Sequence, residues 1–143
     1  ITETGRDFTP LEEEINFIED YLHLQKLRIP DRENIRVETH ISIDVPSVSI
    51  APLLLLPFIE NAFKYGISTD HPCRIKITLN VQNKTLHFRA ENTLFPDKNK
   101  PTGLGTGIEN TRQRLELIYP GRHQLVYGPQ ENNFLVILTL NLD

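Results

Sequence analysis

The chain is organised around one stretch of ten residues, Pro57-Phe58-Ile59-Glu60-Asn61-Ala62-Phe63-Lys64-Tyr65-Gly66. Asn61, Lys64 and Tyr65 stand at positions i, i+3 and i+4, a spacing that places their side chains on one face of a helix. The opposite face is apolar and continues the four leucines that precede Pro57. Gly66 supplies the permissive backbone at which helices commonly end. The stretch therefore predicts a helix with a core-facing side and one polar stripe.

The polar stripe combines an amide oxygen, an ammonium group and an aromatic ring, a set that suits a magnesium-bound phosphate ester. Mg²⁺ binds oxygen ligands and keeps several waters, which the lone carbonyl of Asn61 permits. Lys64 can act as a point charge for phosphate oxygens. The alternative is that Glu60 and Lys64, four residues apart, form an ordinary surface ion pair. This stretch alone leaves both interpretations open.

Composition restricts the class of protein. At 143 residues, 38% of them hydrophobic and 24% charged, the chain is typical of one globular domain. Its net charge of −4 and the lack of a basic stripe argue against nucleic acid as a partner. The single cysteine, Cys73, allows no internal disulfide. The chain begins with Ile1 rather than Met, so we expect it to be a piece of a longer protein.

A first helix is predicted from Thr9 to about Arg28. Thr9 can cap it, Pro10 fits the first helical position, and Glu12 completes a capping box. Pro30 prevents continuation. Residues 1–8, which lack a pattern, are interpreted as the end of a linker.

Two further helices are predicted from the apolar periodicity, at about residues 52–65 and 107–118. Pro57 conflicts with a straight helix, so we expect either a kink or a late start there. Alternation of apolar and polar residues predicts five strands, at about residues 35–43, 75–81, 86–90, 123–127 and 134–142.

The glycines near the third helix give a second functional signal. Gly103, Gly105 and Gly107 alternate and lead directly into that helix. Glycines let the backbone approach a phosphate closely, and a helix N-terminus offers free N–H groups. Residues 93–106 otherwise lack a pattern, which is typical of a functional lid. The motif is not a Walker loop, because no Gly-Lys-Ser/Thr follows, and it does not follow a strand as a dinucleotide fingerprint does.

Taken together, the two stretches resemble the N box and the G2 box of the histidine kinase/gyrase B/Hsp90-like ATPase superfamily. Residues 60–66 are similar to the N box, and residues 103–110, with Arg112 and Arg114-Leu115, are similar to the G2 box. Three further segments resemble LytS/YehU-type sensor histidine kinases: Tyr21–Arg28, Pro52-x₄-Pro57, and Arg114-Leu115 to Tyr119-Pro120. The resemblance covers the chain from about Leu11 to its end.

The resemblance implies a fold that agrees with the element count. It is the Bergerat-type ATP-binding fold, an α+β two-layer sandwich. Three helices pack on one face of a mixed, mostly antiparallel sheet of about five strands. Residues 9–143 would form this domain, with the lid at about 93–106.

The resemblance also implies roles for individual residues. Asn61 would coordinate Mg²⁺, Lys64 would hold a phosphate and Tyr65 would pack beside the nucleotide. Glu60 would polarise the phosphate acceptor. The phosphates would be cradled by the glycine segment, comprising Gly103, Leu104, Gly105, Thr106 and Gly107.

The adenine-binding position departs from the family. The family's G1 box carries an Asp at the end of a strand, followed by Gly-x-Gly. Because Leu86, Phe88, Ala90 and Asn92 share one strand face, Asn92 falls in that position, and Glu91 should point the other way. The Asn92 amide oxygen can accept a hydrogen bond from the adenine amino group. No glycines follow Asn92, which puts the affinity for adenine in question.

The resemblance implies an ATP-binding catalytic domain of a two-component sensor histidine kinase that uses ATP and Mg²⁺. None of the five histidines has the family's phospho-acceptor pattern. The acceptor is therefore expected in an upstream dimerisation domain of a homodimer, and the isolated fragment should not phosphorylate itself. The implied partners are this domain and a cognate response regulator, with no nucleic acid. We expect the cytoplasmic domain of a bacterial sensor that meets the membrane only through the missing N-terminal part.

Two alternatives remain open from the sequence. One is a nucleotide-independent signalling or scaffold module of the same fold, suggested by the missing G1 glycines. The other is a superfamily ATPase, which Pro57 disfavours because it stands where such enzymes often carry a water-activating Glu.

Overall fold

The alternating segments form a five-stranded sheet in the order β2-β4-β5-β7-β6. The computed structural model describes residues 8–30, 34–44, 47–95 and 106–143. The strands are β2 (Ile35–Ile43), β4 (Cys73–Gln82), β5 (Thr85–Thr93), β6 (His123–Gln130) and β7 (Asn133–Asn141). β2 pairs parallel with β4, and every other neighbouring pair in the sheet is antiparallel. The predicted mixed, mostly antiparallel sheet is confirmed.

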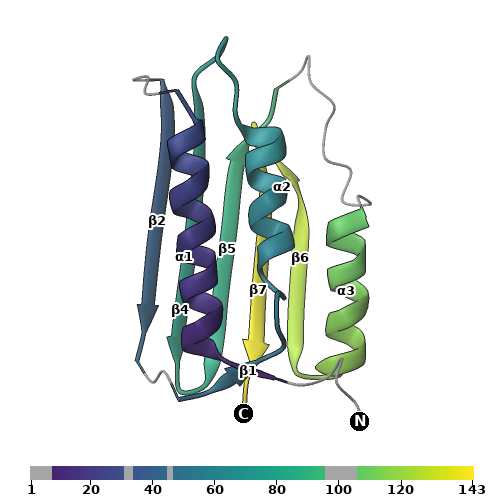
Figure 1. The fold of residues 1–143 in the computed structure, drawn as a ribbon. Coiled ribbons are helices and arrows are strands. Elements are labelled where there is room, and N and C mark those ends of the chain that lie inside the picture. The colour runs from purple at the N-terminus through teal and green to yellow at the C-terminus, as the bar shows by residue number, and fades with distance from the viewer. Residues whose placement is uncertain (1–7, 31–33, 45–46, 96–105) are drawn as a thin grey trace.

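Three helices lie on one face of this sheet (Figure 1). They are α1 (Leu11–Arg28), α2 (Leu56–Gly66) and α3 (Thr106–Ile118). The strand residues that face them are buried in alternation, as period-2 patterning requires. Phe58 of α2 and Phe88 of β5 lie at the centre of the core, with ring centroids 5.9 Å apart. The predicted two-layer α+β sandwich is therefore confirmed.

The start of the first helix differs from the prediction. Thr9 and Pro10 form a two-residue strand, β1 (Thr9–Pro10), which pairs with β3 (Ser49–Ile50). Helix α1 begins at Leu11, whose N–H donates to the Val48 carbonyl at 2.8 Å. No side chain caps the helix, and the Thr9 hydroxyl donates instead to Glu13 at 3.1 Å. The predicted capping box with Glu12 is wrong because strand pairing already satisfies this backbone.

The start of α2 resolves the conflict at Pro57. The helix begins at Leu56, which places Pro57 in its first turn, where the missing N–H costs nothing. The late start is confirmed, and the predicted beginning near Pro52 is wrong. Leu53 adopts a left-handed conformation with φ of 55°, which turns the chain into the helix. Such a conformation is uncommon for a non-glycine residue.

The hairpin between β4 and β5 turns at Asn83 and Lys84, whose φ values are 53° and 64°. Two consecutive positive φ angles define the tight turn whose twist matches antiparallel strands. The predicted turn is confirmed, and β5 continues to Thr93, beyond the predicted end at residue 90.

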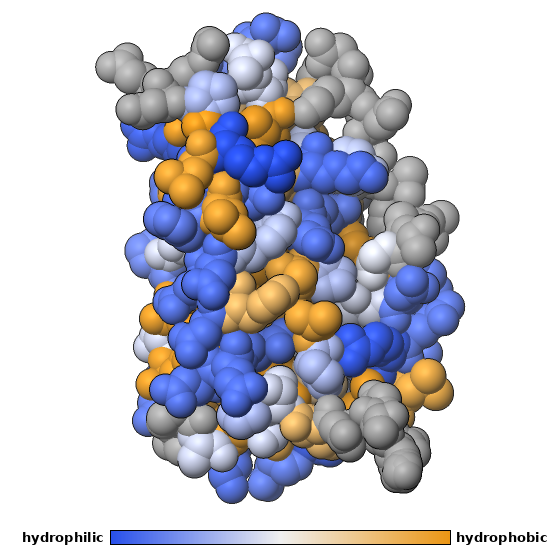
Figure 2. Space-filling model, in the orientation of Figure 1, coloured by the Kyte–Doolittle hydropathy of each residue, from blue (hydrophilic) through white to orange (hydrophobic). Residues whose placement is uncertain are grey.

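The helix-covered side carries hydrophobic groups among charged ones (Figure 2). On α1, Phe17, Leu24 and Leu27 are exposed. No helix in the described part of the chain is long and apolar enough to cross a membrane.

Candidate functional site

The two motif stretches converge at one cleft between α2 and α3. The cleft has a volume of about 240 Å³ and is lined by Pro57, Glu60, Asn61, Lys64, Tyr65, Gly107 and Ile108. Residues 57–65 belong to α2, and Gly107 and Ile108 belong to the first turn of α3. The structure thus places the polar stripe of α2 beside the end of the glycine segment.

The packing of α2 separates its two faces. Phe58, Ile59, Ala62 and Phe63 are buried against the sheet and α1, and Glu60 and Lys64 are exposed. The Lys64 ammonium lies 5.4 Å from the centroid of the Tyr65 ring, within range of a cation–π interaction. Among the described residues no ion pair joins Glu60 to Lys64. The structure does not support the alternative of a simple surface ion pair.

Tyr21 of α1 lies beside this face. Its ring meets Phe63 edge-on, with centroids 6.2 Å apart. Burial, and secondly the negative charge of Glu60, raise the pKa of Tyr21 above its ordinary value. Glu60 therefore brings negative charge to the exposed side of α2, close to Asn61. Sequence reasoning did not predict this neighbour, because Tyr21 and Glu60 meet only in the folded chain.

Asn92 lies at the end of the core-facing row of β5. It is 2% exposed, and the other residues on this face of the strand, Leu86, Phe88 and Ala90, are buried as well. Its amide group donates to the Thr93 carbonyl at 3.0 Å. Glu91 lies on the opposite face, where Asn133 of β7 donates to it at 2.8 Å. Asn92 and Glu91 therefore point to opposite faces of the sheet, as the alternation of side chains along a strand predicts. The role of Asn92 in binding adenine remains a prediction.

Gly66 is required by the approach of α2 to β5. A Cβ atom at this position would lie 2.6 Å from the Cβ of Asn92, closer than real side-chain contacts. The helix ends at Gly66 as predicted, and its φ is not among the positive ones. The absence of a side chain lets the helix end and Asn92 pack together.

Most of the predicted phosphate cradle lies outside the described residues. This applies to Gly103, Leu104 and Gly105, to the side chain of Thr106, and to most of the predicted lid at 93–106. Gly107 is exposed and borders the cleft. A Cβ at Gly107 would meet Pro57 at 3.7 Å, an ordinary contact. The position therefore does not require glycine for steric reasons.

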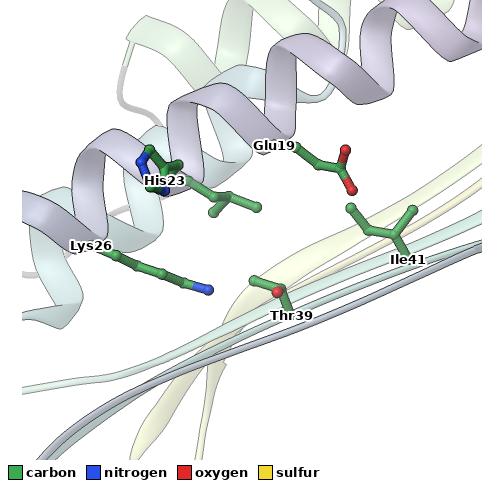
Figure 3. A pocket seen from close by; sticks show the side chains of 6 residues that line it. Glu19, His23, Lys26, Thr39 and Ile41 are labelled. Carbon is green, nitrogen blue, oxygen red and sulfur yellow. The ribbon is translucent and has the colours of Figure 1, made fainter.

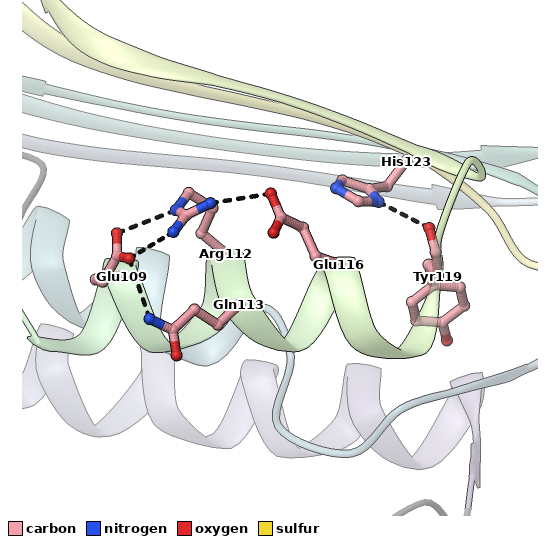
Figure 4. Close-up of polar contacts among 6 residues, drawn as sticks. All are labelled: Glu109, Arg112, Gln113, Glu116, Tyr119 and His123. Atoms are coloured by element: carbon pink, nitrogen blue, oxygen red, sulfur yellow. Dashed lines mark hydrogen bonds and ion pairs between the residues drawn. The ribbon is translucent and has the colours of Figure 1, made fainter.

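A network centred on Arg112 runs along α3 (Figure 4). Arg112 donates to Glu109 at 2.6 Å and to Glu116 at 2.9 Å, and Gln113 donates to Glu109 at 3.2 Å. The hydrogen bond from Arg112 lowers the pKa of Glu109, and the same partner raises that of Arg112. Ion pairs that water can reach contribute little to stability. Arg112 thus supports α3 rather than the cleft.

A larger groove lies between α1 and the edge strand β2 (Figure 3). It has a volume of about 320 Å³ and is lined by Glu19, Leu22, His23, Lys26, Thr39 and Ile41. His23 and Lys26 are both exposed. No residue of the two motifs lines this groove, so size alone does not identify the site.

A sensor kinase is similar to part of this chain in sequence. The chain is 36% identical over 81 residues to the sensor protein kinase HptS of Staphylococcus aureus (strain USA300). That match covers 56% of this chain and 15% of the length of that kinase. No family model matches.

Solved structures with the same fold are histidine kinase domains. The histidine kinase domain of a blue-light activated kinase from Erythrobacter litoralis EL346 has a TM-score of 0.63 at 17% identity, covering 99% of this chain and 70% of that one. The catalytic domain of histidine kinase ThkA, nucleotide free, has a TM-score of 0.59 at 18% identity, covering 95% and 97%. ThkA was also solved in complex with the response regulator TrrA, with a TM-score of 0.55 at 15% identity, covering 96% of this chain and 42% of that one.

These findings confirm the resemblance at two levels. The chain has the fold of histidine kinase catalytic domains, and it is similar in sequence to a sensor protein kinase. The narrower resemblance to the LytS/YehU type remains a prediction.

Proposed function

We propose that this chain is the ATP-binding catalytic domain of a two-component sensor histidine kinase. It presents Mg²⁺-ATP for phosphoryl transfer to a histidine in another part of the full protein. The observation that carries the proposal is the cleft at which the polar stripe of α2 meets the first turn of α3. The shared fold and the similarity to a sensor protein kinase support the same function.

The cleft fits Mg²⁺ that is held jointly by protein and nucleotide. In the described part of the chain, no group of three or more His, Cys, Asp or Glu side chains could hold a metal ion. Mg²⁺ in such sites is commonly bound through one or two protein ligands together with substrate phosphates. The amide oxygen of Asn61 is one such ligand. When bound, the ion would neutralise charge on the phosphate oxygens.

The neighbouring side chains supply the remaining functions. Lys64 is exposed at the cleft and can donate charge-assisted hydrogen bonds to phosphate oxygens. Tyr65 offers its ring beside the nucleotide. Glu60, one position before Asn61, can orient the imidazole of an incoming acceptor histidine. Phosphoryl transfer relies on such positioning and charge neutralisation, so no covalent step by this chain is needed.

The volume of the cleft indicates that the described residues hold only part of a nucleotide. About 240 Å³ is below the roughly 300–1,000 Å³ of ordinary small-molecule sites. Residues 103–105 of the glycine segment are proposed to supply further contacts to the phosphates. Asn92 is proposed to bind the adenine.

A second candidate function is a signalling module of the same fold that does not bind nucleotide. The burial of Asn92 favours it, because its amide already donates to Thr93 and only 2% of the residue is exposed. The two functions differ in one measurable property, which is affinity for Mg²⁺-nucleotide.

The central experiment is calorimetry with Mg²⁺ and a non-hydrolysable ATP analogue on the wild type and on Asn61→Ala. Loss of even an outer-shell partner changes metal affinity by about 10–100-fold, so we expect a weakening of at least about tenfold. Asn16→Ala, an exposed position on α1, is the matched control and should bind like the wild type. Absence of binding by the wild type would instead favour the nucleotide-independent module. Loss of cooperative unfolding in Asn61→Ala would assign Asn61 a structural role.

Base preference tests the proposed role of Asn92. The amide oxygen should prefer adenine, which offers an amino group, over guanine, which offers a carbonyl at that position. Competition between ATP and GTP analogues measures the preference. Equal affinities for the ATP and GTP analogues would show that Asn92 does not bind the base.

The origin of the acceptor is tested with labelled ATP. We expect this chain to bind ATP without forming acid-labile, base-stable label, because a histidine must be held close to the γ-phosphate for transfer. Adding a helical acceptor segment from the full protein should restore labelling. Stable label on one of the five histidines of this chain would show that the acceptor lies within it.

A further inference from the structure

Helix α2 lacks a cap of its own, although it carries the polar stripe of the cleft. Its N-cap position is Leu55, and no side chain caps the helix there. The first N–H groups of a helix have no partner within the helix and need one from elsewhere. The chain enters α2 through Leu53 in the left-handed conformation, with φ of 55°. A non-glycine residue holds such a conformation only where its surroundings enforce it.

Glu14 of α1 holds the turn that precedes α2. Its carboxylate accepts the Leu53 N–H at 3.1 Å. The residue is 3% exposed, although most glutamates stay in solvent. Its second oxygen, Oε2, is buried and has no hydrogen-bond partner among the described residues. A carboxylate buried in this way must have a compensating interaction, and the amides that precede α2 provide it.

The charges around Glu14 support this assignment. Burial is the largest influence and raises the pKa of Glu14 above its ordinary value of 4.5. The backbone N–H groups of Leu53, Leu54 and Leu55 and the positive charge of Arg114 act in the opposite direction. Tyr119 is also nearby: burial is the main cause that raises the pKa of its hydroxyl, and the charge of Glu14 adds to it. The carboxylate therefore lies near the amides of the three residues that precede α2 and near a cation on α3.

Helix α3 and its C-terminal end hold the other side of the same loop. Arg114 donates to the Leu53 carbonyl at 3.4 Å. The Tyr119 hydroxyl, one residue beyond α3, accepts the Ala51 N–H at 3.0 Å, and Tyr119 is 1% exposed. The Leu53 residue is thus fixed through its N–H by α1 and through its carbonyl by α3. The entry into α2 is set by two other helices rather than by local sequence.

We propose that Glu14 is a positioning residue for the cleft. Its carboxylate accepts from the Leu53 N–H and, with Arg114, fixes the left-handed turn that leads into α2. This sets the position of the first turn of α2 and hence of Glu60 and Asn61. The effect of Glu14 on ligand binding rests on the proposed function. Its effect on the conformation of the turn before α2 does not.

The test compares amide hydrogen exchange and Mg²⁺-nucleotide affinity in variants of the 143-residue chain. In Glu14→Ala, the amides of Leu53, Leu54 and Leu55 should exchange about tenfold faster or more, the effect of losing one buried acceptor. Affinity for the Mg²⁺-bound ATP analogue should fall by about threefold or more, because a small misplacement of binding groups is costly. Affinity for the analogue without Mg²⁺ should change less, because Asn61 acts through the metal.

Three variants separate positioning from general stability. Glu14→Gln keeps an acceptor oxygen and should restore slow exchange and affinity. Glu14→Asp keeps the charge but has a shorter side chain, so it should behave like Glu14→Ala. It replaces Glu14→Ala in the test if that variant does not fold. Glu12→Ala removes an exposed charge from the same turn of α1 and should match the wild type.

The outcomes are distinguishable. Exchange that is unchanged at residues 53–55 in both Glu14→Ala and Glu14→Asp, or accelerated equally throughout the sheet, overturns the positioning role. A wild type that binds no nucleotide overturns the proposed function, and the exchange measurements still decide the role of Glu14.

Discussion

The two faces of α2 differ in what surrounds them. The inner face, with Phe58, Ile59 and Ala62, is at most 1% exposed and packs into the core. The outer face, with Glu60 and Lys64, is open to solvent at the cleft. One helix therefore carries both the packing that stabilises the domain and the groups proposed to bind ligand. Substitutions on the inner face should change the free energy of unfolding, and those on the outer face should change affinity.

The largest effect is expected at Phe58. Removal of this ring from its contact with Phe88 in Phe58→Ala should lower the free energy of unfolding by about 3–5 kcal/mol. Denaturant unfolding followed by circular dichroism measures it. Phe58→Leu should cost less, because it leaves a smaller cavity. A cost below about 1 kcal/mol for Phe58→Ala would contradict a well-packed inner face.

The end of α2 gives the next largest effect. In Gly66→Ala, the added methyl group would lie 2.6 Å from the Asn92 Cβ, and such overpacking costs about 1–3 kcal/mol. Gly107→Ala is the matched control, because its methyl group would meet Pro57 at an ordinary 3.7 Å. Thermal unfolding of both variants measures the difference. Equal melting temperatures would mean that α2 and β5 separate readily at this point.

Substitution of Lys64 tests the outer face of α2. Lys64→Ala should leave the free energy of unfolding within about 0.5 kcal/mol of the wild type, as for most surface substitutions. It should weaken binding of the ATP analogue by about tenfold or more, since a hydrogen bond to a charged group contributes about 1.5–3 kcal/mol. Lys26→Ala, exposed on α1, is the control. An affinity unchanged by Lys64→Ala would place the phosphates elsewhere.

The smallest effect concerns pH. Burial raises the pKa of Glu14 above 4.5, so ionisation is less favourable in the folded state than in the unfolded state. The stability that Glu14 provides is therefore complete below the unfolded pKa and decreases as the pH rises through the folded pKa. Glu14→Gln does not titrate and should not show this decrease. Unfolding free energies of both proteins measured from pH 4 upwards test the sign, and a difference that is constant with pH contradicts it.

The sequence was sufficient wherever a local pattern carried the information. Period-2 alternation located all five strands of the sheet, and the i, i+3, i+4 spacing identified the polar stripe of α2. The turn at Asn83-Lys84 and the late start at Pro57 followed from the chemistry of single residues. Each of these features depends on neighbours within a few positions along the chain, so the pattern is present in the sequence itself.

Tertiary structure decided the features that join distant segments. The backbone of Thr9 and Pro10 pairs with β3. The local sequence predicted a capping motif instead, because it does not show this distant strand. Gly66 is needed for the close contact with Asn92, and the turn that leads into α2 is held by Glu14, a residue from another helix. In each case a backbone or buried polar group must find a partner, and the nearest suitable partner lies far away in sequence. The sequence thus determined the elements and the residue types of the site, whereas only the packed fold determined what holds them in place.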